Sequence, residues 1–128
     1  MIADTSFLID IARGDTSASE KAKELTRRKE PLAISAISLF ELWQGSGKLT
    51  EKELYVLTEL IGRSMIILLE LENAEAAGII SSQLRRKGVQ ISPPDCLIAG
   101  TALSGNDSLL TRNTKDFSHI EGLRVETY

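Results

Sequence analysis

The chain has 128 residues, the size of one domain, and its 42% hydrophobic and 26% charged residues exclude a disordered or collagen-like protein. Its net charge of −3 neither supports nor excludes a nucleic-acid partner, because the balance turns positive if four of the acids hold a metal ion. One cysteine and one histidine exclude an internal disulfide and a zinc site built from Cys and His. Any metal would have carboxylate ligands, which favours hard ions.

No segment has the features of a signal peptide or of a membrane span. The N-terminus lacks a charged region followed by a long apolar stretch. The longest apolar run, at residues 65–69, is far too short to cross a bilayer. We therefore expect a soluble cytoplasmic protein without a membrane partner.

Short apolar strands alternate with amphipathic helices, which predicts a single α/β domain over residues 1–128 with a parallel sheet. In the first half, Ser17 and Glu20 have the spacing of a capping box that opens a helix, and Pro31 ends that helix. The expected elements are a strand at 2–4, helices at 5–13 and 17–29, a strand at 32–35 and a strongly apolar helix at 37–44.

In the second half, Thr50 and Glu53 form the clearest capping box of the chain, and Gly62 is expected to stop the helix. Ser92 begins a later helix that includes Asp95 in its first turn. The expected elements are helices at 50–62, 73–87 and 92–103, strands at 65–69, 108–111 and 123–126, and a short helical turn at 113–118. The last strand is expected at an edge of the sheet.

Four acidic residues are expected to meet at one rim of this sheet. Ligands of open parallel sheets bind beyond the carboxyl ends of the strands. Asp4 ends the first strand, Glu41 lies in the helix after the second strand, and Asp116 follows the fourth. Asp95 lies in the first turn of a helix whose N-terminal end would face the same rim. Four acids far apart in the sequence can thus converge on one site.

Four carboxylates at one place require a compensating cation, because like charges within about 4–6 Å raise each other's pKa. Mg²⁺ or Mn²⁺ suits oxygen-only ligands, and such a site can activate a water and stabilise displacement at a phosphodiester. The chain has no His pair to act as acid and base on a 2′-hydroxyl. We therefore expect metal-assisted hydrolysis by water, which leaves a 5′-phosphate and a 3′-hydroxyl.

Each acid also has a purely structural alternative. Asp4 can cap the helix that follows it, and Asp95 and Asp116 each lie three residues after a Ser or an Asn, the spacing of a capping box. Glu41 lies in a helix that is apolar on most sides, where an unpaired carboxylate is unfavourable. A structural role for Glu41 would therefore need a buried Arg partner.

Four segments together resemble the PIN domain, and in particular the VapC-type toxins of toxin–antitoxin pairs. They are Asp4-Thr5-Ser6, Ser38-x-x-Glu41-Leu42, Asp95-x-x-Ile98-Ala99 and Thr111-Arg112-Asn113-x-x-Asp116-Phe117. Each segment alone is a weak signal, but all four in this order within 128 residues are quite specific and span essentially the whole chain. Gly100, where the family often has Ala, is a minor departure.

The resemblance implies a three-layer fold with a parallel sheet of four to five strands, in the order 3-2-1-4-5, between helices. It maps an acidic metal-binding quartet onto Asp4, Glu41, Asp95 and Asp116, and supporting polar positions onto Thr5, Ser6, Thr111 and Asn113. It further implies a Mg²⁺- or Mn²⁺-dependent endoribonuclease toxin that cuts RNA, often tRNA or rRNA, and forms a homodimer. Its partner would be a small antitoxin that lays a segment over the acidic groove, often with an Arg or Lys reaching the site.

Other residues allow both a functional and a structural interpretation. Arg112 and Lys115 flank the fourth motif and can hold substrate phosphates or be exposed loop charges. Phe40 and Trp43 are expected in the core or on a partner-binding surface rather than as stacking platforms for RNA bases. His119 has no evident partner and is expected at the surface.

Two other functions compete with this one. A receiver-like or inactive α/β regulatory module would hold Mg²⁺ without cutting, but no acidic pair follows residues 2–3 and no Asp follows residues 65–69, where receivers usually carry them. An RNA-maturation or DNA nuclease would use the same acidic site. Such enzymes often carry added domains, for which this chain has no room.

Overall fold

The computed structural model describes residues 1–128 and contains one sheet of five parallel strands. The strands are β1 (Ile2–Ala3), β2 (Ala33–Ser35), β3 (Met65–Ile67), β4 (Ser108–Leu110) and β5 (Arg124–Glu126). Their order is β3-β2-β1-β4-β5, and the central residue Ala3 pairs with Ile34 on one side and with Leu110 on the other. The structure confirms the order that the resemblance implied and the edge position expected for the last strand.

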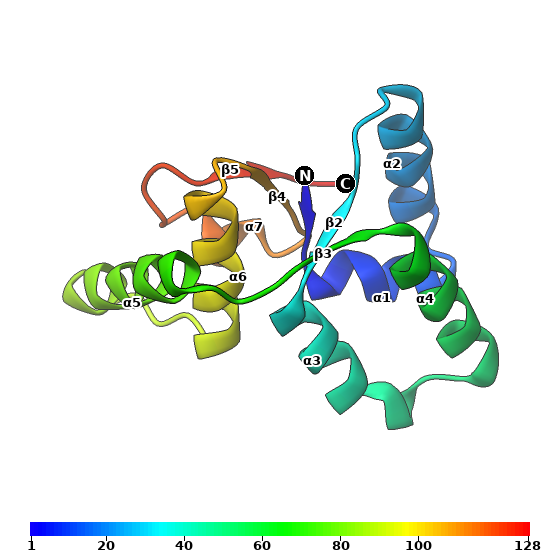
Figure 1. The fold of residues 1–128 in the computed structure, drawn as a ribbon, viewed down its shortest axis with the longest axis horizontal. Helices are drawn as coiled ribbons and strands as arrows, with labels where there is room; N and C mark the ends of the chain where they lie inside the picture. Colours follow the sequence, from blue (N-terminus) through cyan, green and yellow to red (C-terminus); the bar gives the residue numbers. More distant parts are fainter.

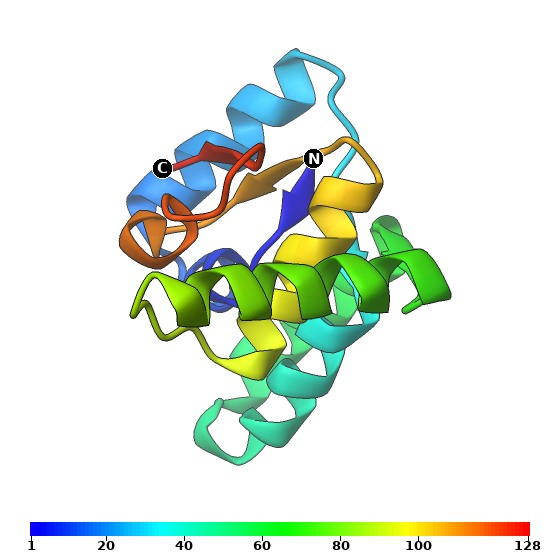
Figure 2. The same ribbon diagram turned by 90° about the vertical axis from the view of Figure 1, so that its left-hand side faces the viewer.

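Helices cover both faces of the sheet, which makes the molecule three-layered (Figures 1 and 2). They are α1 (Thr5–Arg13), α2 (Thr16–Arg27), α3 (Ala36–Gln44), α4 (Glu51–Arg63), α5 (Leu71–Arg86), α6 (Pro93–Ser104) and α7 (Thr114–Phe117), with a 3-10 turn at Ser46–Lys48. In Figure 1, α5 and α6 lie on one side of the sheet and α1, α2 and α4 on the other. The structure contains no helix with the length and apolar character that crossing a membrane requires.

Two apolar clusters, one on each face of the central strands, form the core. Ile2 and Leu109 are fully buried in the cluster beneath α5 and α6, together with Ile98 of α6. Ala3 and Leu110 are fully buried in the cluster beneath α1, α2 and α4. Successive residues of β1 and β4 therefore face opposite layers, and burial on both faces explains why these short strands are continuously apolar.

Side chains at the N-termini of two helices fix where those helices begin. The capping box expected in α4 is confirmed, because Thr50 Oγ1 accepts a hydrogen bond from the Glu53 amide at 3.2 Å and Glu53 Oε2 accepts one from the Thr50 amide at 2.7 Å. At α3, Ser35 Oγ accepts a hydrogen bond from the Ser38 amide at 2.9 Å. This cap starts α3 immediately after β2, so the chain passes from strand to helix without a loop.

The capping box expected at Ser17 and Glu20 is wrong. Helix α2 begins at residue 16 and is capped by Asp15, whose carboxylate accepts a hydrogen bond from the Ala18 amide at 2.9 Å. Helix α1 ends just before, with Gly14 in the left-handed conformation at φ 74°. The glycine turn leaves Asp15 as the first residue able to cap, and Asp serves at that position as well as Ser does.

Helices α5 and α6 approach each other so closely that a side chain does not fit at Gly100. A Cβ atom at Gly100 would lie 2.6 Å from the Ala77 amide nitrogen and 2.7 Å from the Asn73 carbonyl oxygen, both of them backbone atoms of α5. The departure at Gly100 is minor for the family resemblance, but the glycine is required by the packing of this chain. The glycine sets the distance between α5 and the helix that carries Asp95.

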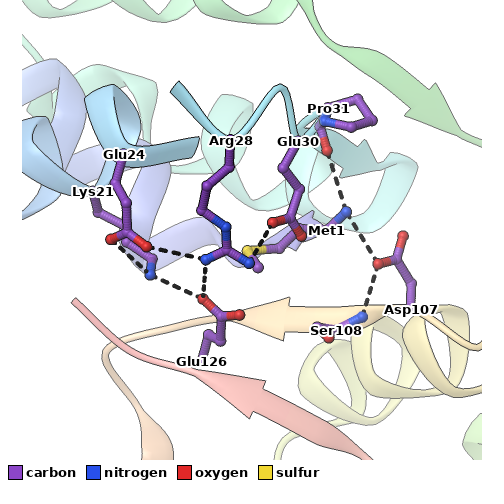
Figure 3. A network of polar contacts seen from close by, with 9 residues as sticks. All are labelled: Met1, Lys21, Glu24, Arg28, Glu30, Pro31, Asp107, Ser108 and Glu126. Carbon is purple, nitrogen blue, oxygen red and sulfur yellow. Dashed lines mark hydrogen bonds and ion pairs between the residues drawn. The ribbon is translucent and has the colours of Figure 1, made fainter. Parts of the chain in front are cut away.

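A network of charged side chains joins α2 to the edge strand β5 (Figure 3). Glu126 Oε2 lies 2.9 Å from Lys21 Nζ and 3.8 Å from Arg28 Nη1, and Arg28 Nη2 lies 2.8 Å from Glu30 Oε2. The hydrogen bond to Glu126 raises the pKa of Lys21. Because these groups are partly exposed, their contribution to stability is modest, but they tie the outer helix of one layer to the edge of the sheet.

Candidate active site

The four acids expected at the sheet rim lie on four different elements. Asp4 directly follows β1 and is the N-cap residue of α1. Glu41 lies on α3, which starts directly after β2. Asp95 is in the first turn of α6, and Asp116 is in α7, a few residues beyond β4. Asp4 is buried and the other three are partly buried.

Two hydroxyl groups hold the carboxylate of Asp4. Asp4 Oδ2 accepts hydrogen bonds from Ser6 Oγ at 2.8 Å and from Thr111 Oγ1 at 2.7 Å. Thr111 is fully buried and is itself fixed, because its Oγ1 accepts a hydrogen bond from the Asn113 amide at 2.9 Å. Although Asp4 occupies the N-cap position, its side chain makes no capping hydrogen bond. The capping alternative for Asp4 therefore does not describe its contacts.

Each of the other three acids also accepts a hydrogen bond from an uncharged side chain. The bonds run from Thr5 Oγ1 to Glu41 Oε2 (2.6 Å), from Ser92 Oγ to Asp95 Oδ2 (2.7 Å) and from Asn113 Nδ2 to Asp116 Oδ2 (2.7 Å). In every case one carboxylate oxygen takes the bond and the other has no protein partner. All four polar residues expected in supporting positions thus donate a hydrogen bond directly to an acid of the set.

No Lys or Arg neutralises these four carboxylates, because none of them takes part in an ion pair. Burial raises the pKa of Glu41, and the charges of Asp95 and Asp4 raise it further, against the opposing hydrogen bond from Thr5. Burial likewise raises the pKa of Asp95, with added effects from Asp4 and Asp116. The acids are therefore close enough to repel one another, and the buried Arg that a structural role for Glu41 required is absent.

The donor set suits a hard divalent cation, because every side chain offered is a carboxylate with one oxygen free. The side chains are spread more widely than a coordination shell, however, and no three Asp, Glu, His or Cys groups converge closely enough to hold a metal ion as they stand. Ligation of a common ion would require the free carboxylate oxygens to turn towards one another across the rim.

The two cations that flank the fourth motif differ in their surroundings. Lys115 is exposed and forms no ion pair. Arg112 Nη1 lies 2.9 Å from Asp10 Oδ2, and its side chain keeps 64% of its surface exposed. Sequence reasoning missed Asp10, which is only 5% exposed. Asp10 lies four residues after Ser6, so the two residues share one face of α1. This spacing could have indicated from the sequence that Asp10 lies near the site.

Two aromatic residues of α3 lie at the surface. Phe40 is 58% exposed and Trp43 is 56% exposed. The core position that the sequence allowed for them is therefore wrong, and the partner-binding surface stays a prediction. His119 is exposed, as expected.

Comparisons with known proteins agree with this fold. The model of the PIN domain family matches residues 1–123. The tRNA(fMet)-specific endonuclease VapC of Shigella flexneri is 29% identical over 127 residues, which cover 98% of this chain and 95% of the relative. Ribonuclease VapC2 of Rickettsia felis is 34% identical over 107 residues, which cover 82% of this chain and 80% of the relative.

Solved structures give the same result. A chain of the crystal structure of VapBC2 from Rickettsia felis, bound to a DNA fragment from its promoter, superposes with a TM-score of 0.87 at 28% identity over 99% of this chain and 97% of that chain. A chain of DNA-bound VapBC from Salmonella typhimurium also gives 0.87, at 29% identity over 98% of this chain and 96% of that one. This protein therefore belongs to the PIN-domain family, among the VapC ribonucleases.

Proposed function

We propose that this chain is an endoribonuclease that hydrolyses RNA phosphodiesters with a metal-activated water, and that it is the toxin of a toxin–antitoxin pair. The observation that carries the proposal is the uncompensated acidic rim. Burial raises the pKa of Glu41 and of Asp95, and the neighbouring carboxylates add to this effect, yet the protein supplies only uncharged donors to the four acids. An arrangement of this kind is unfavourable by itself and becomes favourable when a divalent cation binds.

Asp4, Glu41, Asp95 and Asp116 are the residues that would hold Mg²⁺ or Mn²⁺. When bound, the ion would lower the pKa of a water molecule and offset the negative charge that develops on the phosphodiester. The chain's own part is to orient the carboxylates, and the buried Thr111 hydroxyl does so for Asp4. The lone His119 is exposed, so no His pair is available for attack by a 2′-hydroxyl. Hydrolysis by water accordingly leaves a 5′-phosphate and a 3′-hydroxyl.

The substrate that we propose is structured RNA of the tRNA or rRNA class. The relative from Shigella flexneri is named as specific for tRNA(fMet), which makes that tRNA the first substrate to test. The only cations beside the acids in the fourth motif are Arg112 and Lys115, and we propose that both contact substrate phosphates.

The partners that we propose are a small antitoxin and a second copy of this chain. Helices α3 and α4 enclose a narrow apolar hollow that Trp43 helps to line, and they also expose Phe40 and Tyr55. These exposed aromatic side chains suit an apolar antitoxin segment. A basic side chain at the end of that segment would then complement the acidic rim. The edge strand β3 leads into an exposed apolar stretch that includes Leu68 and Leu71, 65% and 78% exposed, and suits self-association.

The test is cleavage of a labelled tRNA(fMet) transcript, with rRNA and a DNA of the same sequence beside it, in Mg²⁺, Mn²⁺ or EDTA. We expect RNA to be cut only with the metals and the products to carry 5′-phosphates. Asp95→Asn and Asp4→Asn should each lower the rate by at least about 100-fold, because residues that merely orient metal ligands are already worth about 10–100-fold. Glu121→Gln, an exposed acid outside the rim, removes the same charge and should retain activity.

Cleavage that continues in EDTA, or unchanged in Asp95→Asn, would overturn the quartet mechanism. Metal binding is measured separately as the rise in Tm on adding Mg²⁺, which should be lost in Asp95→Asn. A Tm rise without any cleavage would instead favour the non-catalytic Mg²⁺-binding module, and cleavage of DNA in preference to RNA would favour a DNA nuclease. Co-expression with a small protein encoded in the neighbouring reading frame should abolish cleavage if that protein is the antitoxin.

A further inference from the structure

We propose that Asp10 and Tyr128 are positioning residues that hold the guanidinium group of Arg112 beside the acidic rim, where it binds a phosphate of the RNA. The inference rests on the proposed ribonuclease function and extends it to two residues outside the four motifs. The three residues come from α1, from the segment after β4 and from the segment after β5. They are therefore brought together only by the folded sheet.

Asp10 is the centre of this cluster. Its Oδ2 accepts a hydrogen bond from Tyr128 Oη at 2.8 Å and lies 2.9 Å from Arg112 Nη1. Asp10 is 5% exposed, and a carboxylate so deeply buried is stable only with strong partners. Arg112 and Tyr128 are those partners, and both bind the same oxygen.

Tyr128 is itself packed against the core. Its ring packs edge-on against Phe7, with ring centroids 5.0 Å apart and an interplanar angle of 72°, and Phe7 is fully buried. Burial and the Asp10 carboxylate raise the pKa of Tyr128, so its hydroxyl stays protonated and remains a donor. Tyr128 thereby adds a second contact that holds the Asp10 carboxylate.

Arg112 is linked to the catalytic set by its own backbone. Its amide donates to Ser6 Oγ at 3.4 Å, and Ser6 Oγ in turn donates to Asp4 Oδ2 at 2.8 Å. The guanidinium group has five N–H donors, and Nη1 alone pairs with protein, so the others are free to bind an anion. A paired and oriented Arg loses less freedom on binding phosphate than a free one. Lys115, which has no partner, lacks this advantage.

If Asp10 affected RNA only through its charge, its substitution would change KM in the opposite direction from that expected for a positioning role. Asp10→Asn removes a negative charge near the substrate, so simple electrostatics predicts tighter RNA binding and a lower KM. If Asp10 positions Arg112, the same substitution raises KM by about 3–10-fold, the range expected for ordering one long side chain, and leaves kcat nearly unchanged. Tyr128→Phe keeps the charge, and we expect it to raise KM by a smaller factor.

The experiment measures KM and kcat on the tRNA(fMet) transcript for Asp10→Asn, Tyr128→Phe, Arg112→Gln and the double variant Asp10→Asn/Arg112→Gln, with Glu121→Gln as the charge-matched control. Dissociation constants are measured by fluorescence anisotropy in Mg²⁺ in the Asp95→Asn background, where the RNA should remain intact. Thermal unfolding shows which variants are folded. Should Asp10→Asn fail to fold, Tyr128→Phe carries the test.

We expect Asp10→Asn to weaken RNA binding when Arg112 is present. In the Arg112→Gln variant, adding Asp10→Asn should not change RNA binding. A KM that falls or stays constant in Asp10→Asn would overturn the inference while leaving the ribonuclease function intact. If Asp10→Asn does not fold, a KM that stays constant in Tyr128→Phe would do so. An undiminished effect of Asp10→Asn in the double variant would do the same. If the wild-type protein cuts no RNA, the proposed function fails instead, and the dissociation constants still decide whether Asp10 and Tyr128 act through Arg112.

Discussion

At the scale of single residues, the rim carries negative charges that the protein leaves without positive partners. The hydroxyl of Thr5 stabilises ionised Glu41, but burial and the neighbouring carboxylates outweigh it, because the net result is a raised pKa. Such a residue reduces the stability of the folded chain at neutral pH. Functional sites commonly reduce stability in this way.

We expect Glu41→Gln to stabilise the metal-free protein at pH 7 and to lose activity. The amide keeps an acceptor for Thr5 Oγ1 and removes the charge, and because Glu41 is only partly buried the gain should be about 1 kcal/mol or less. Unfolding in urea with EDTA present measures this difference, with Glu121→Gln as control. In saturating Mg²⁺ the order should reverse, because the wild type gains the binding energy of the ion. A destabilised Glu41→Gln in EDTA would contradict the electrostatic account.

The difference in stability between the wild type and Glu41→Gln changes with pH in a definite direction. The folded chain binds a proton at Glu41 more readily than the unfolded chain does, because folding raises this pKa. The penalty from Glu41 is therefore fully present above the folded-state pKa and disappears as the pH falls through it towards the unfolded-state pKa. In EDTA, the stability advantage of Glu41→Gln should shrink between pH 7 and pH 4, as measured by urea unfolding at each pH. An advantage that grows on acidification would show that the pKa is not raised.

The residues that sequence reasoning could locate are those whose positions follow from local rules. Asp4 lies directly after an apolar strand and Asp116 a few residues after another, and Glu41 is conspicuous as a charge in an apolar helix. Asp10 could not be assigned a role in the same way, because its partner Tyr128 lies 118 positions away. Only the neighbourhood of β1, β4 and β5 reveals that contact.

At the scale of secondary-structure elements, the contact between α5 and α6 determines where Asp95 lies. At Gly100 the backbone of α5 occupies the space that a methyl group would need. Because backbone atoms cannot move aside as a flexible side chain does, an added methyl group must separate the two helices.

We expect Gly100→Ala to destabilise the protein by about 1–3 kcal/mol, the usual range for overpacking, and to lower activity by displacing Asp95. Gly78→Ala is the matched control, because Gly78 lies on α5 with open space around its Cα and Ala favours a helix by about 1 kcal/mol over Gly. Thermal unfolding of the two variants should therefore give shifts of opposite sign. Equal shifts would show that the close contact does not limit the packing.

Element types followed from hydrophobic periodicity, whereas several element ends did not. Helix α5 was expected from residue 73 but begins at Leu71. The reason is that the Asn73 side chain, from the third position of the helix, accepts a hydrogen bond from the amide of the N-cap residue Glu70 at 2.8 Å. The sequence allows Asn73 to cap either as the first residue or from the third position. The Asn73 side chain also donates a hydrogen bond to Ser104 Oγ of α6 at 2.7 Å, which favours the second arrangement.

At the scale of the whole molecule, one edge of the sheet is left uncovered. Strand β3 is an edge strand, and Met65, Leu68 and Leu71 are 63%, 65% and 78% exposed. An exposed apolar edge of this kind favours association with another chain.

We expect the wild-type protein to sediment at twice its chain mass and the variant Leu68→Glu/Leu71→Glu to sediment as a monomer, because two carboxylates per chain would have to be buried at the interface. Analytical ultracentrifugation over a range of concentrations measures this. Thr58→Glu/Glu59→Gln, on the exposed side of α4, is the control and should remain dimeric. A wild-type monomer at all concentrations would rule out the β3 edge as a self-association surface.

The strand order determines when, during its synthesis, the chain can become an active ribonuclease. The central strand acquires its second neighbour only when Leu109 reaches Ile2, and contacts so distant in sequence form late. Ribosome-bound chains stalled before residue 108 should leave RNA uncut, and cutting by them would refute this. A polypeptide still being translated is thus inactive, and an inhibitor synthesised alongside it has until the final segment emerges to bind.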